Sequence, residues 1–374
     1  MSTTSAIIAY NSADGKNINW KYKSGIKVRE DLKDHEVLVD MHSVGLCHSD
    51  IFMGVGDPDT FPRILGHEGT GYVAKVGSKV TSVEVGDPVI LSFTYCDECS
   101  QCKAGYPGYC YDFIQKNLLG TDTDVTYTLD GEKVGGKFFG QSSFAKRAVV
   151  NDTSVVNVKS LNIKKEDLAK FGPLGCGFQT GAGSIYYSGD AKAGESCVVY
   201  GLGGVGFAGI MAAKIAGCNP IIGVDTNERK FELAKKLGCT HTIKAGTDEE
   251  VHDQIVEITG HGADLSFECI GGSRFVQNAI NNANNRGKIV YVGVASFTET
   301  IEVPSLAFMT GGKKLIGSTE GDAHPQKFIP KMIEWHSKGQ FPVEDLQKFY
   351  KIEDFQKAVD DMKNGNVIKP ILMY

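Results

Sequence analysis

The stretch Gly201-Leu-Gly-Gly-Val-Gly206 decides the fold of this chain. It follows the continuous apolar run Ser196-Cys-Val-Val-Tyr200 and opens a segment rich in Ala, Gly and Ile that is typical of a helix. Asp225 stands nineteen positions after Gly206, at the end of the next apolar run. A strand, a glycine loop, a helix and a trailing acid in this order predict a dinucleotide-binding βαβ unit.

Each glycine of the loop has a physical task. Gly201 permits the tight turn, Gly203 lets the backbone approach a pyrophosphate, and Gly206 lets the helix pack against the strand. The helix N-terminus at Gly204 and Val205 offers N–H donors to the anion. The alternative is a purely structural glycine turn, because a chain with 45 glycines can match the pattern by chance. The flanking strand, helix and acid favour the cofactor loop.

Asp225 bears on the choice of cofactor. Its carboxylate can accept hydrogen bonds from both ribose hydroxyls, whereas a 2′-phosphate would bring negative charge against it, so we expect NAD. Asp at this junction is also a good helix N-cap, and both roles can hold. Arg229 and Lys230 are nearby cations that could accommodate the extra phosphate, and we count Lys230 among the cofactor-binding residues.

The hydrophobic pattern of the sequence changes along the chain. Residues 17–156 show short period-2 runs broken by Gly, Pro, Asp and Ser, which predict a compact β-rich unit. From residue 174 apolar strands alternate with helical segments, as in a doubly wound parallel sheet. Two amphipathic helical segments and a short strand follow. We predict an α/β chain, with a β-rich domain at 1–177 completed by 319–374 and a Rossmann domain at 178–318.

Composition and charge narrow the function classes. The chain has 374 residues, of which 41% are hydrophobic and 22% charged, which excludes disorder and fibrous repeats. The formal charge of −6 offers no footprint for a nucleic acid or an anionic membrane. The N-terminus lacks the features of a secretory signal, and no apolar run approaches the ~20 residues of a membrane span. We expect a cytoplasmic protein with a small-molecule ligand and no membrane or nucleic-acid partner.

Four of the ten cysteines form the pattern Cys96-x2-Cys99-x2-Cys102-x7-Cys110 within a polar, Gly-rich loop. In a reducing compartment, clustered thiols are more often metal ligands than disulfides. Four thiolates close a tetrahedral zinc site with no open position, so this site should hold the loop in shape rather than react. An iron–sulfur cluster is the competing occupant, and unligated cysteines are the remaining alternative.

Three further candidate ligands are dispersed along the chain. Cys47 lies in Gly45-Leu-Cys-His-Ser-Asp50, His67 in Gly66-His-Glu-Gly-Thr-Gly71, and Cys176 in Pro173-Leu-Gly-Cys-Gly-Phe178. Spacing alone does not unite them. Taken singly, either cysteine fits the packing of a small buried residue, and His67 fits a hydrogen-bonded core histidine.

Together these motifs resemble those of the zinc-dependent medium-chain alcohol dehydrogenases, in the family's order and over essentially the whole chain. The resemblance implies a GroES-like β-rich catalytic domain interrupted by a Rossmann domain. It implies two zinc ions per chain, one structural and one catalytic. The catalytic zinc would be held by Cys47, His67 and Cys176, with a fourth position for water or substrate oxygen, and Glu68 resembles a carboxylate that can approach the metal.

The chemistry of the family explains these residue types. Two thiolates and one neutral imidazole cancel the charge of Zn²⁺ and leave it acidic enough to lower the pKa of a bound alcohol, which then gives hydride to the nicotinamide. Ser49 matches the hydroxyl that accepts the alcohol proton, and Asp50 resembles a carboxylate that orients His67. A turn-forming serine and an Asx cap are the alternatives for these two. Thr180, in Leu-Gly-Cys-Gly-Phe-Gln-Thr-Gly, belongs to the implied cofactor site.

The sequence departs from the family pattern at three positions. Phe52 stands where many animal members have a histidine that ends the proton relay. His48, where others have Arg, could finish the relay or touch the pyrophosphate. Lys369 replaces the usual Arg at a pyrophosphate-contacting position, and because Lys lacks the bidentate fork, cofactor binding could be weaker and NADH release faster.

The substrate is predicted from one short motif. Phe138-Phe-Gly-Gln-Ser-Ser-Phe144 is similar to bacterial aryl-alcohol (benzyl alcohol) dehydrogenases, and the long stretch between Cys110 and Gln141 resembles that of dimeric members. We therefore predict a homodimer, with a tetramer left open, that interconverts a primary aromatic or allylic alcohol and its aldehyde. Five aromatic residues could line the pocket or be plain core: Phe93, Tyr95, Phe138, Phe139 and Phe144.

Two other functions are compatible with parts of this pattern. An S-(hydroxymethyl)glutathione (formaldehyde) dehydrogenase has the same fold, but we identify no counterpart of the arginine that holds the glutathione carboxylate in that branch. A non-enzymatic zinc and nucleotide-binding protein, such as the lens or quinone-reductase relatives, typically lacks the ligand trio and the four-cysteine loop, and both are present here.

Overall fold

The computed structural model describes the chain except for residues 1, 13–16, 56–59, 120–124, 295 and 297. The chain divides into two compact units. Unit 1 comprises Met1–Cys176, His324–Glu334 and Val343–Tyr374, and unit 2 comprises Gly177–Ala323 and Trp335–Pro342. Among the described residues, no helix is both long and apolar enough to cross a membrane.

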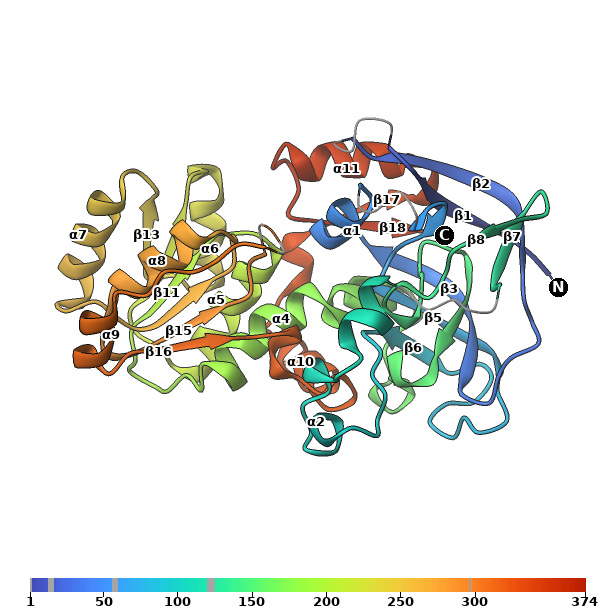
Figure 1. Cartoon of the computed structure of the whole chain (residues 1–374), viewed down its shortest axis with the longest axis horizontal. Helices are drawn as coiled ribbons and strands as arrows, with labels where there is room; N and C mark the ends of the chain where they lie inside the picture. Colours follow the sequence, from blue (N-terminus) through green and yellow to red (C-terminus); the bar gives the residue numbers. More distant parts are fainter. Residues whose placement is uncertain (1, 13–16, 56–59, 120–124, 295, 297) are drawn as a thin grey trace. The chain divides into compact units, whose positions relative to one another are not determined.

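Unit 1 is built from two largely antiparallel sheets (Figure 1). The strands of the first sheet, in spatial order, are β4 (Arg63–Ile64), β1 (Ser2–Tyr10), β2 (Asn19–Val28), β7 (Tyr127–Leu129) and β8 (Glu132–Val134). Those of the second are β10 (Val155–Asn157), β6 (Pro88–Leu91), β5 (Gly69–Val76), β3 (Glu36–Gly45), β18 (Lys369–Met373) and β17 (Gln347–Lys351), with β9 (Arg147–Asn151) also pairing with β3. The helices are short: α1 (His48–Met53), α2 (Ser100–Lys103), α3 (Lys165–Leu168) and α11 (Phe355–Lys363).

The C-terminal segment is part of unit 1 and not a separate body. Strand β18 pairs antiparallel with β3, so that Ile371 lies opposite Gly45, and β17 pairs parallel with β18. Phe355 and Val359 of α11 are buried in the same hydrophobic core as Trp20. The last strand thus brings Lys369 to the end of β3, next to Leu46 and Cys47.

Unit 2 is a parallel six-stranded sheet in the order β13-β12-β11-β14-β15-β16. Its strands are β11 (Cys197–Tyr200), β12 (Ile221–Asp225), β13 (His241–Lys244), β14 (Ala263–Glu268), β15 (Ala283–Tyr291) and β16 (Lys314–Gly317). Its helices are α4 (Gly177–Gly183), α5 (Gly204–Ala216), α6 (Phe231–Leu237), α7 (Asp248–Thr259), α8 (Ser273–Asn281) and α9 (Ser305–Gly311), and α10 (Pro325–Ser337) has residues in both units. The strand order reverses between β11 and β14, which confirms the predicted doubly wound sheet.

Successive side chains of the central strands point to opposite faces of this sheet, and both faces are covered by a hydrophobic core. Val198 and Tyr200 of β11 belong to a hydrophobic cluster with Val251 of α7 and Val276 of α8. Residues on α5 are buried as well, and a side chain at Gly209 would meet the ring of Phe267 from β14. Strands buried on both faces are the reason that these sequences read as continuous apolar runs.

The grouping of residues differs from the predicted domain bounds at two places. Residues 319–323 and 335–342 group with unit 2, whereas the sequence analysis assigned them to the β-rich domain. Aromatic contacts explain the second difference, because the ring of Trp335 lies 5.4 Å from that of Tyr186, and the ring of Phe341 lies 6.5 Å from that of Phe178. The domain bounds themselves stay a prediction.

A buried carboxylate at the start of β3 gives a pH-dependent prediction. Glu36 is 6% exposed, and its carboxylate lies 2.9 Å from Arg29 Nη2 and 3.0 Å from Lys137 Nζ. Burial raises the pKa of Glu36, but Arg29, Lys137 and the Lys33 N–H together lower it to about 2. A carboxyl whose pKa falls on folding adds stability above its unfolded pKa of about 4.3, and this stability is lost as the pH falls toward 2.

We expect Glu36→Gln to reduce the free energy of unfolding at pH 7 by about 3 kcal/mol, the equivalent of roughly two pKa units. Urea unfolding followed by tryptophan fluorescence at pH 7 and at pH 3 measures this. The difference between the two proteins should be smaller at pH 3. A difference that does not change with pH would show that the ion pair is not its source.

Candidate active site

Strand pairing brings the first two candidate ligands together. In the β3–β5 ladder Val44 lies opposite Gly69, and the Gly45 N–H donates to the Glu68 carbonyl at 3.0 Å. Cys47 follows the end of β3 and His67 precedes the start of β5, so the two ends meet at the same edge of the sheet. Gly66 has a φ of +86°, and a side chain there would collide with the backbone of Phe144.

The third candidate ligand comes from a separate turn. Cys176 follows the 3-10 segment Ala169–Gly175, and its N–H donates to the Pro173 carbonyl at 3.3 Å. This segment is tied to the sheet by Ser92, whose hydroxyl donates to the Gly175 carbonyl at 2.6 Å. A side chain at Gly175 would lie only 1.9 Å from the Leu91 carbonyl oxygen, so the turn approaches the sheet as closely as glycine allows.

The structure brings the ligand atoms of four residues to one point. Atoms of Cys47, His67, Glu68 and Cys176 lie within 4.8 Å of one another. His67 Nε2 is buried and has no hydrogen-bond partner in the described part of the chain. A buried polar nitrogen without a partner is costly, and a metal ion would satisfy it. Two sulfurs and an imidazole nitrogen are donors that zinc accepts, so the residues fit a catalytic zinc site.

Asp50 fixes the orientation of two of these residues. It is fully buried, and one carboxylate oxygen lies 2.9 Å from His67 Nδ1 while also accepting the Gly66 N–H at 3.0 Å. The other oxygen accepts the Cys47 N–H at 3.0 Å. An ionised carboxylate only accepts hydrogen bonds, so it favours the tautomer with hydrogen on Nδ1 and leaves the Nε2 lone pair for a metal.

The surroundings favour the ionised form of the Cys47 thiol. A hydrogen bond with Cys176 lowers the pKa of Cys47 well below its ordinary value, against the effect of burial, and Lys369 lowers it further. The thiolate is the form of cysteine that binds metals. The electrostatics therefore agree with the donor geometry.

Lys369 and Glu68 form a buried ion pair beside the ligands. Lys369 Nζ lies 2.8 and 2.9 Å from the two oxygens of Glu68 and donates to the Leu46 carbonyl at 3.3 Å. Burial lowers the pKa of Lys369, but Glu68, Cys47 and Cys176 together raise it above its ordinary value, so the amine stays charged. The predicted role of Lys369 at the cofactor pyrophosphate stays a prediction, and the structure shows a partner that sequence analysis did not foresee.

The candidate proton-relay residues lie on α1. The hydroxyl oxygen of Ser49 is 3.8 Å from the sulfur of Cys47, and Ser49 is half-buried. His48 is exposed at the start of the helix, and Phe52 is 42% exposed one turn later. The Ser49 hydroxyl is thus close to the sulfur of a candidate ligand, on a helix that also carries an exposed histidine.

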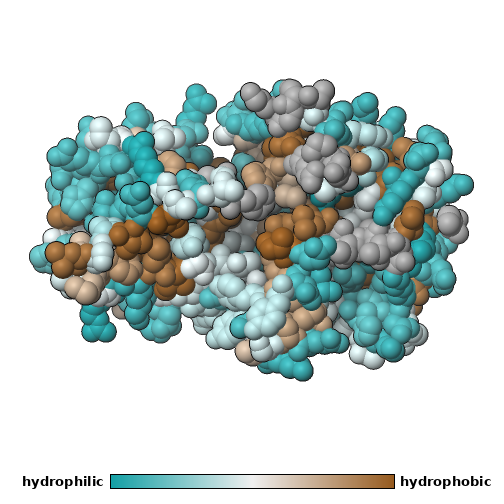
Figure 2. Space-filling model, in the orientation of Figure 1, coloured by the Kyte–Doolittle hydropathy of each residue, from teal (hydrophilic) through white to brown (hydrophobic). Residues whose placement is uncertain are grey.

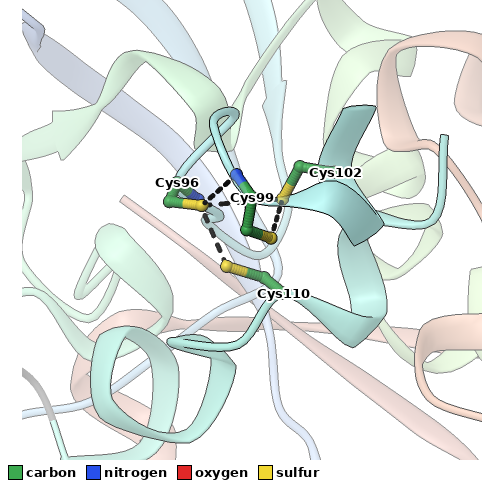
Figure 3. A group of neighbouring side chains, drawn as sticks. All are labelled: Cys96, Cys99, Cys102 and Cys110. Atoms are coloured by element: carbon green, nitrogen blue, oxygen red, sulfur yellow. Dashed lines mark hydrogen bonds between the residues drawn. The ribbon is translucent and has the colours of Figure 1, made fainter. Parts of the chain in front are cut away.

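The four cysteines of the 96–110 loop converge as their spacing predicts (Figure 3). Cys102 Sγ lies 3.8 Å from Cys96 Sγ and 3.5 Å from Cys99 Sγ. A tetrahedron of sulfurs at about 2.3 Å from zinc has edges of about 3.8 Å, so these distances suit one metal ion.

Backbone amides stabilise negative charge on these sulfurs. The N–H of Cys96 donates to Cys110 Sγ at 3.4 Å, and the N–H of Cys99 donates to Cys96 Sγ at 3.3 Å. Backbone donors from Cys102 and Tyr111 lower the pKa of Cys99 to about 6. Cys47, His67 and Cys176 are not among these residues, so the part of the chain that the structure describes holds two separate candidate metal sites.

In unit 2, the glycine loop connects β11 to α5. Gly201 has a φ of +93°, a side chain at Gly206 would lie 1.9 Å from the Gly201 carbonyl, and one at Gly203 would meet open space. Helix α5 begins at Gly204, followed by Val205. The loop thus has the tight turn, the close helix–strand approach and the open face that a pyrophosphate needs.

Asp225 ends β12 beside this loop. It accepts the Leu202 N–H at 2.8 Å and the Asn227 N–H at 2.8 Å, and it lies 3.0 Å from Lys230 Nζ. Thr180, on α4 of the same unit, has its hydroxyl 3.5 Å from a carboxylate oxygen of Glu320. Glu320 lies in no motif of the sequence and was not among the predicted site residues.

The fold and the two metal-type sites define a class: an oxidoreductase with a nucleotide-binding sheet and a zinc-type catalytic centre. Two family descriptions match this chain. Residues 33–160 match the alcohol dehydrogenase GroES-like domain, and residues 204–338 match the zinc-binding dehydrogenase domain. The chain belongs to the zinc-dependent medium-chain alcohol dehydrogenase family, and the predicted GroES-like and Rossmann folds are confirmed.

Named relatives span the same length. A geraniol dehydrogenase of Castellaniella defragrans is 34% identical over 91% of this chain and 91% of its own. An S-(hydroxymethyl)glutathione dehydrogenase of Synechocystis is 34% identical over 91% of this chain and 92% of its own. The crystal structure of a benzyl alcohol dehydrogenase from Acinetobacter calcoaceticus has a TM-score of 0.91 and 34% identity, covering 100% of this chain and 99% of that chain.

Proposed function

We propose that this alcohol dehydrogenase oxidises a primary aromatic or allylic alcohol to its aldehyde with NAD, reversibly, at a zinc ion held by Cys47, His67 and Cys176. The observation that carries the proposal is the convergence of these three residues, with a buried His67 Nε2 that has no hydrogen-bond partner among the described residues. When bound, zinc lowers the pKa of the alcohol hydroxyl and NAD accepts the hydride. A second zinc at Cys96, Cys99, Cys102 and Cys110 is proposed to be structural.

The chain's own residues orient the site and move the proton. Asp50 orients His67 so that Nε2 is directed toward the other ligands. In the Lys369–Glu68 pair, next to Cys47, the positive charge of the amine balances the negative charge of the carboxylate. The Ser49 hydroxyl receives the alcohol proton. His48, exposed on the same helix, passes it to water in place of the histidine that Phe52 replaces.

Aromatic residues next to the ligands support the substrate class. The ring of Phe139 stacks on His67 at 4.5 Å, and that of Phe138 meets it edge-on at 5.4 Å. Phe113 contacts both Phe139 and Phe93 and so connects Phe93 to these rings. Phe144 instead packs on Trp20 in the core. The relatives named for benzyl alcohol and geraniol point to the same class of substrate.

The substrate proposal is tested by NADH formation with ethanol, benzyl alcohol and an allylic terpene alcohol at matched concentrations. We expect kcat/KM for benzyl or allylic alcohol to exceed that for ethanol by tenfold or more, about 1.4 kcal/mol of discrimination. A preference for ethanol would contradict it. The second candidate, S-(hydroxymethyl)glutathione dehydrogenase, is favoured by the Synechocystis relative. Turnover that appears only with glutathione and formaldehyde would establish that function instead.

Asp225 gives a prediction about the cofactor. We expect Asp225→Ala to lower the kcat/KM ratio of NAD over NADP by roughly 10–100-fold, because a hydrogen bond to a charged group contributes about 1.5–3 kcal/mol. Asp264, which accepts from Ser196 at the amino end of β14, provides the control. Asp264→Ala should leave the ratio unchanged, and an unchanged ratio in Asp225→Ala would remove Asp225 from cofactor selection.

We also propose that the protein is a cytoplasmic homodimer. Strand β16 is the outer strand of the unit 2 sheet, and hydrophobic side chains gather over α9 and β16 (Figure 2). Leu306 and Met309 on α9 are 71% and 70% exposed. An edge strand flanked by apolar side chains is a surface that a second copy of the chain can cover.

A further inference from the structure

The segment Phe138–Phe144 lies directly against the residues that carry His67. The Ser143 N–H donates to the Gly66 carbonyl at 2.9 Å, and the Phe144 N–H donates to the Leu65 carbonyl at 3.0 Å. The hydroxyl of Ser142 donates to the Ile64 carbonyl at 2.7 Å. The motif that suggested a substrate class is therefore also the support of a metal ligand.

The backbone of this segment is strained. Phe139 has a φ of +51° and Ser142 a φ of +52°, the left-handed region that costs a residue other than glycine about 1–2 kcal/mol. In this conformation the ring of Phe139 stacks on the imidazole of His67. Strain of this kind persists where the surrounding structure fixes it, often at functional sites.

Gln141 lies at the centre of the segment and is fully buried. Its Nε2 donates to the carbonyl of His67 and to the carbonyl of Ser92, both at 2.9 Å, and its Oε1 accepts the Gly69 N–H at 3.4 Å. The Ser92 hydroxyl in turn donates to the carbonyl of Gly175, the residue before Cys176. One amide thus connects the backbone of His67 to the turn that carries Cys176.

We propose that Gln141 is a positioning residue of the metal site, which holds the segments of His67 and Cys176 at the separation that one tetrahedral ion requires. An amide suits this place because it offers two N–H donors to two carbonyls and one acceptor to an N–H. A glutamate of the same shape would place one carboxylate oxygen, in place of Nε2, against two carbonyl oxygens. The inference rests on the proposed function, since it requires zinc at the ligand trio.

The test is the release of zinc from the purified holoenzyme to a chromogenic chelator. Gln141→Met keeps the length of the side chain but removes its hydrogen bonds. We expect this variant to release the catalytic zinc, identified as the ion whose loss stops turnover, at a rate roughly 10–100-fold higher than that of wild type. Ser92→Ala removes the hydroxyl that donates to Gly175 and should also speed release, so the proposal can be tested even if Gln141→Met folds poorly.

Asn117 provides a matched control. It is fully buried, its Nδ2 donates to the carbonyls of Thr94 and Phe113, and its Oδ1 accepts the Thr94 N–H, all at 2.9 Å. Asn117→Leu should lower the Tm to a similar extent without changing the release of that zinc.

The outcomes separate the two proposals. If wild type contains zinc and is active, but both Gln141→Met and Ser92→Ala release zinc at the wild-type rate, the positioning role is wrong. The proposed function would stand in that case. Absence of zinc from the trio in wild type would overturn the proposed function and this inference together.

Discussion

Replacement of Cys47 by serine is expected to lower kcat for alcohol oxidation by at least about four orders of magnitude. The change removes a candidate ligand whose sulfur lies within 4.8 Å of a ring nitrogen of His67 and of the Cys176 sulfur. A metal ion contributes several kcal/mol of charge stabilisation, and each 1.36 kcal/mol corresponds to a tenfold change in rate. Steady-state kinetics with benzyl alcohol and NAD, together with metal analysis, measure the effect.

NAD binding should survive this change, because the glycine loop and Asp225 belong to unit 2. We expect the Kd for NAD to stay within about twofold of wild type by calorimetry. Cys239→Ser provides a matched control: Cys239 is buried in unit 2, and burial raises its pKa to about 12, as for an unligated thiol. Full turnover by Cys47→Ser would remove Cys47 from the catalytic site.

Replacement of Cys99 by serine is expected to have the second largest effect, this time on stability. The sulfurs of the 96–110 loop lie close together and accept hydrogen bonds from backbone N–H groups. Structural zinc sites in small peptides contribute about 10–16 kcal/mol at pH 7, so losing even about 4 kcal/mol would lower the Tm by roughly 5–10 °C. The zinc content should fall by one ion per chain, and the loop should become sensitive to protease.

The control for this variant lies in the same loop. Ser100→Ala removes a hydroxyl that hydrogen-bonds to Tyr111 at 2.9 Å and should change neither the zinc content nor the Tm by much. An unchanged zinc content in Cys99→Ser would contradict the structural zinc site. Iron and a visible absorption band in wild type would show that an iron–sulfur cluster occupies it instead.

Local patterns predicted the features that depend on neighbouring residues. The glycine loop predicted a strand before it and a helix after it, and it lies between β11 and α5, which spans Gly204–Ala216. The start of the next helix is less plain from local sequence, because Asn227 caps a 3-10 turn and the α-helix begins only at Phe231. The sequence analysis did not identify α9 (Ser305–Gly311), whose short run carries no clear helical pattern.

Features that depend on long-range pairing were beyond the reach of sequence patterns. The register of β3 against β5 joins Cys47 to His67, and a distant turn delivers Cys176. Only the family resemblance united these three residues in advance. The Lys369–Glu68 pair joins residues 301 positions apart, and nothing in either local sequence indicates it. Gln141 was noted only within a motif similar to that of aryl-alcohol dehydrogenases. Its positioning role was not predicted, because its partners are backbone groups, which leave no mark in a sequence.

The central claim is that a zinc ion at Cys47, His67 and Cys176 is required for alcohol oxidation. The most direct test follows zinc content and NADH formation from benzyl alcohol in one sample while a chelator removes metal. The account predicts two zinc ions per chain at the start, loss of activity in proportion to the loss of one of them, and recovery when zinc is added back. Full activity after that ion has been removed would contradict it.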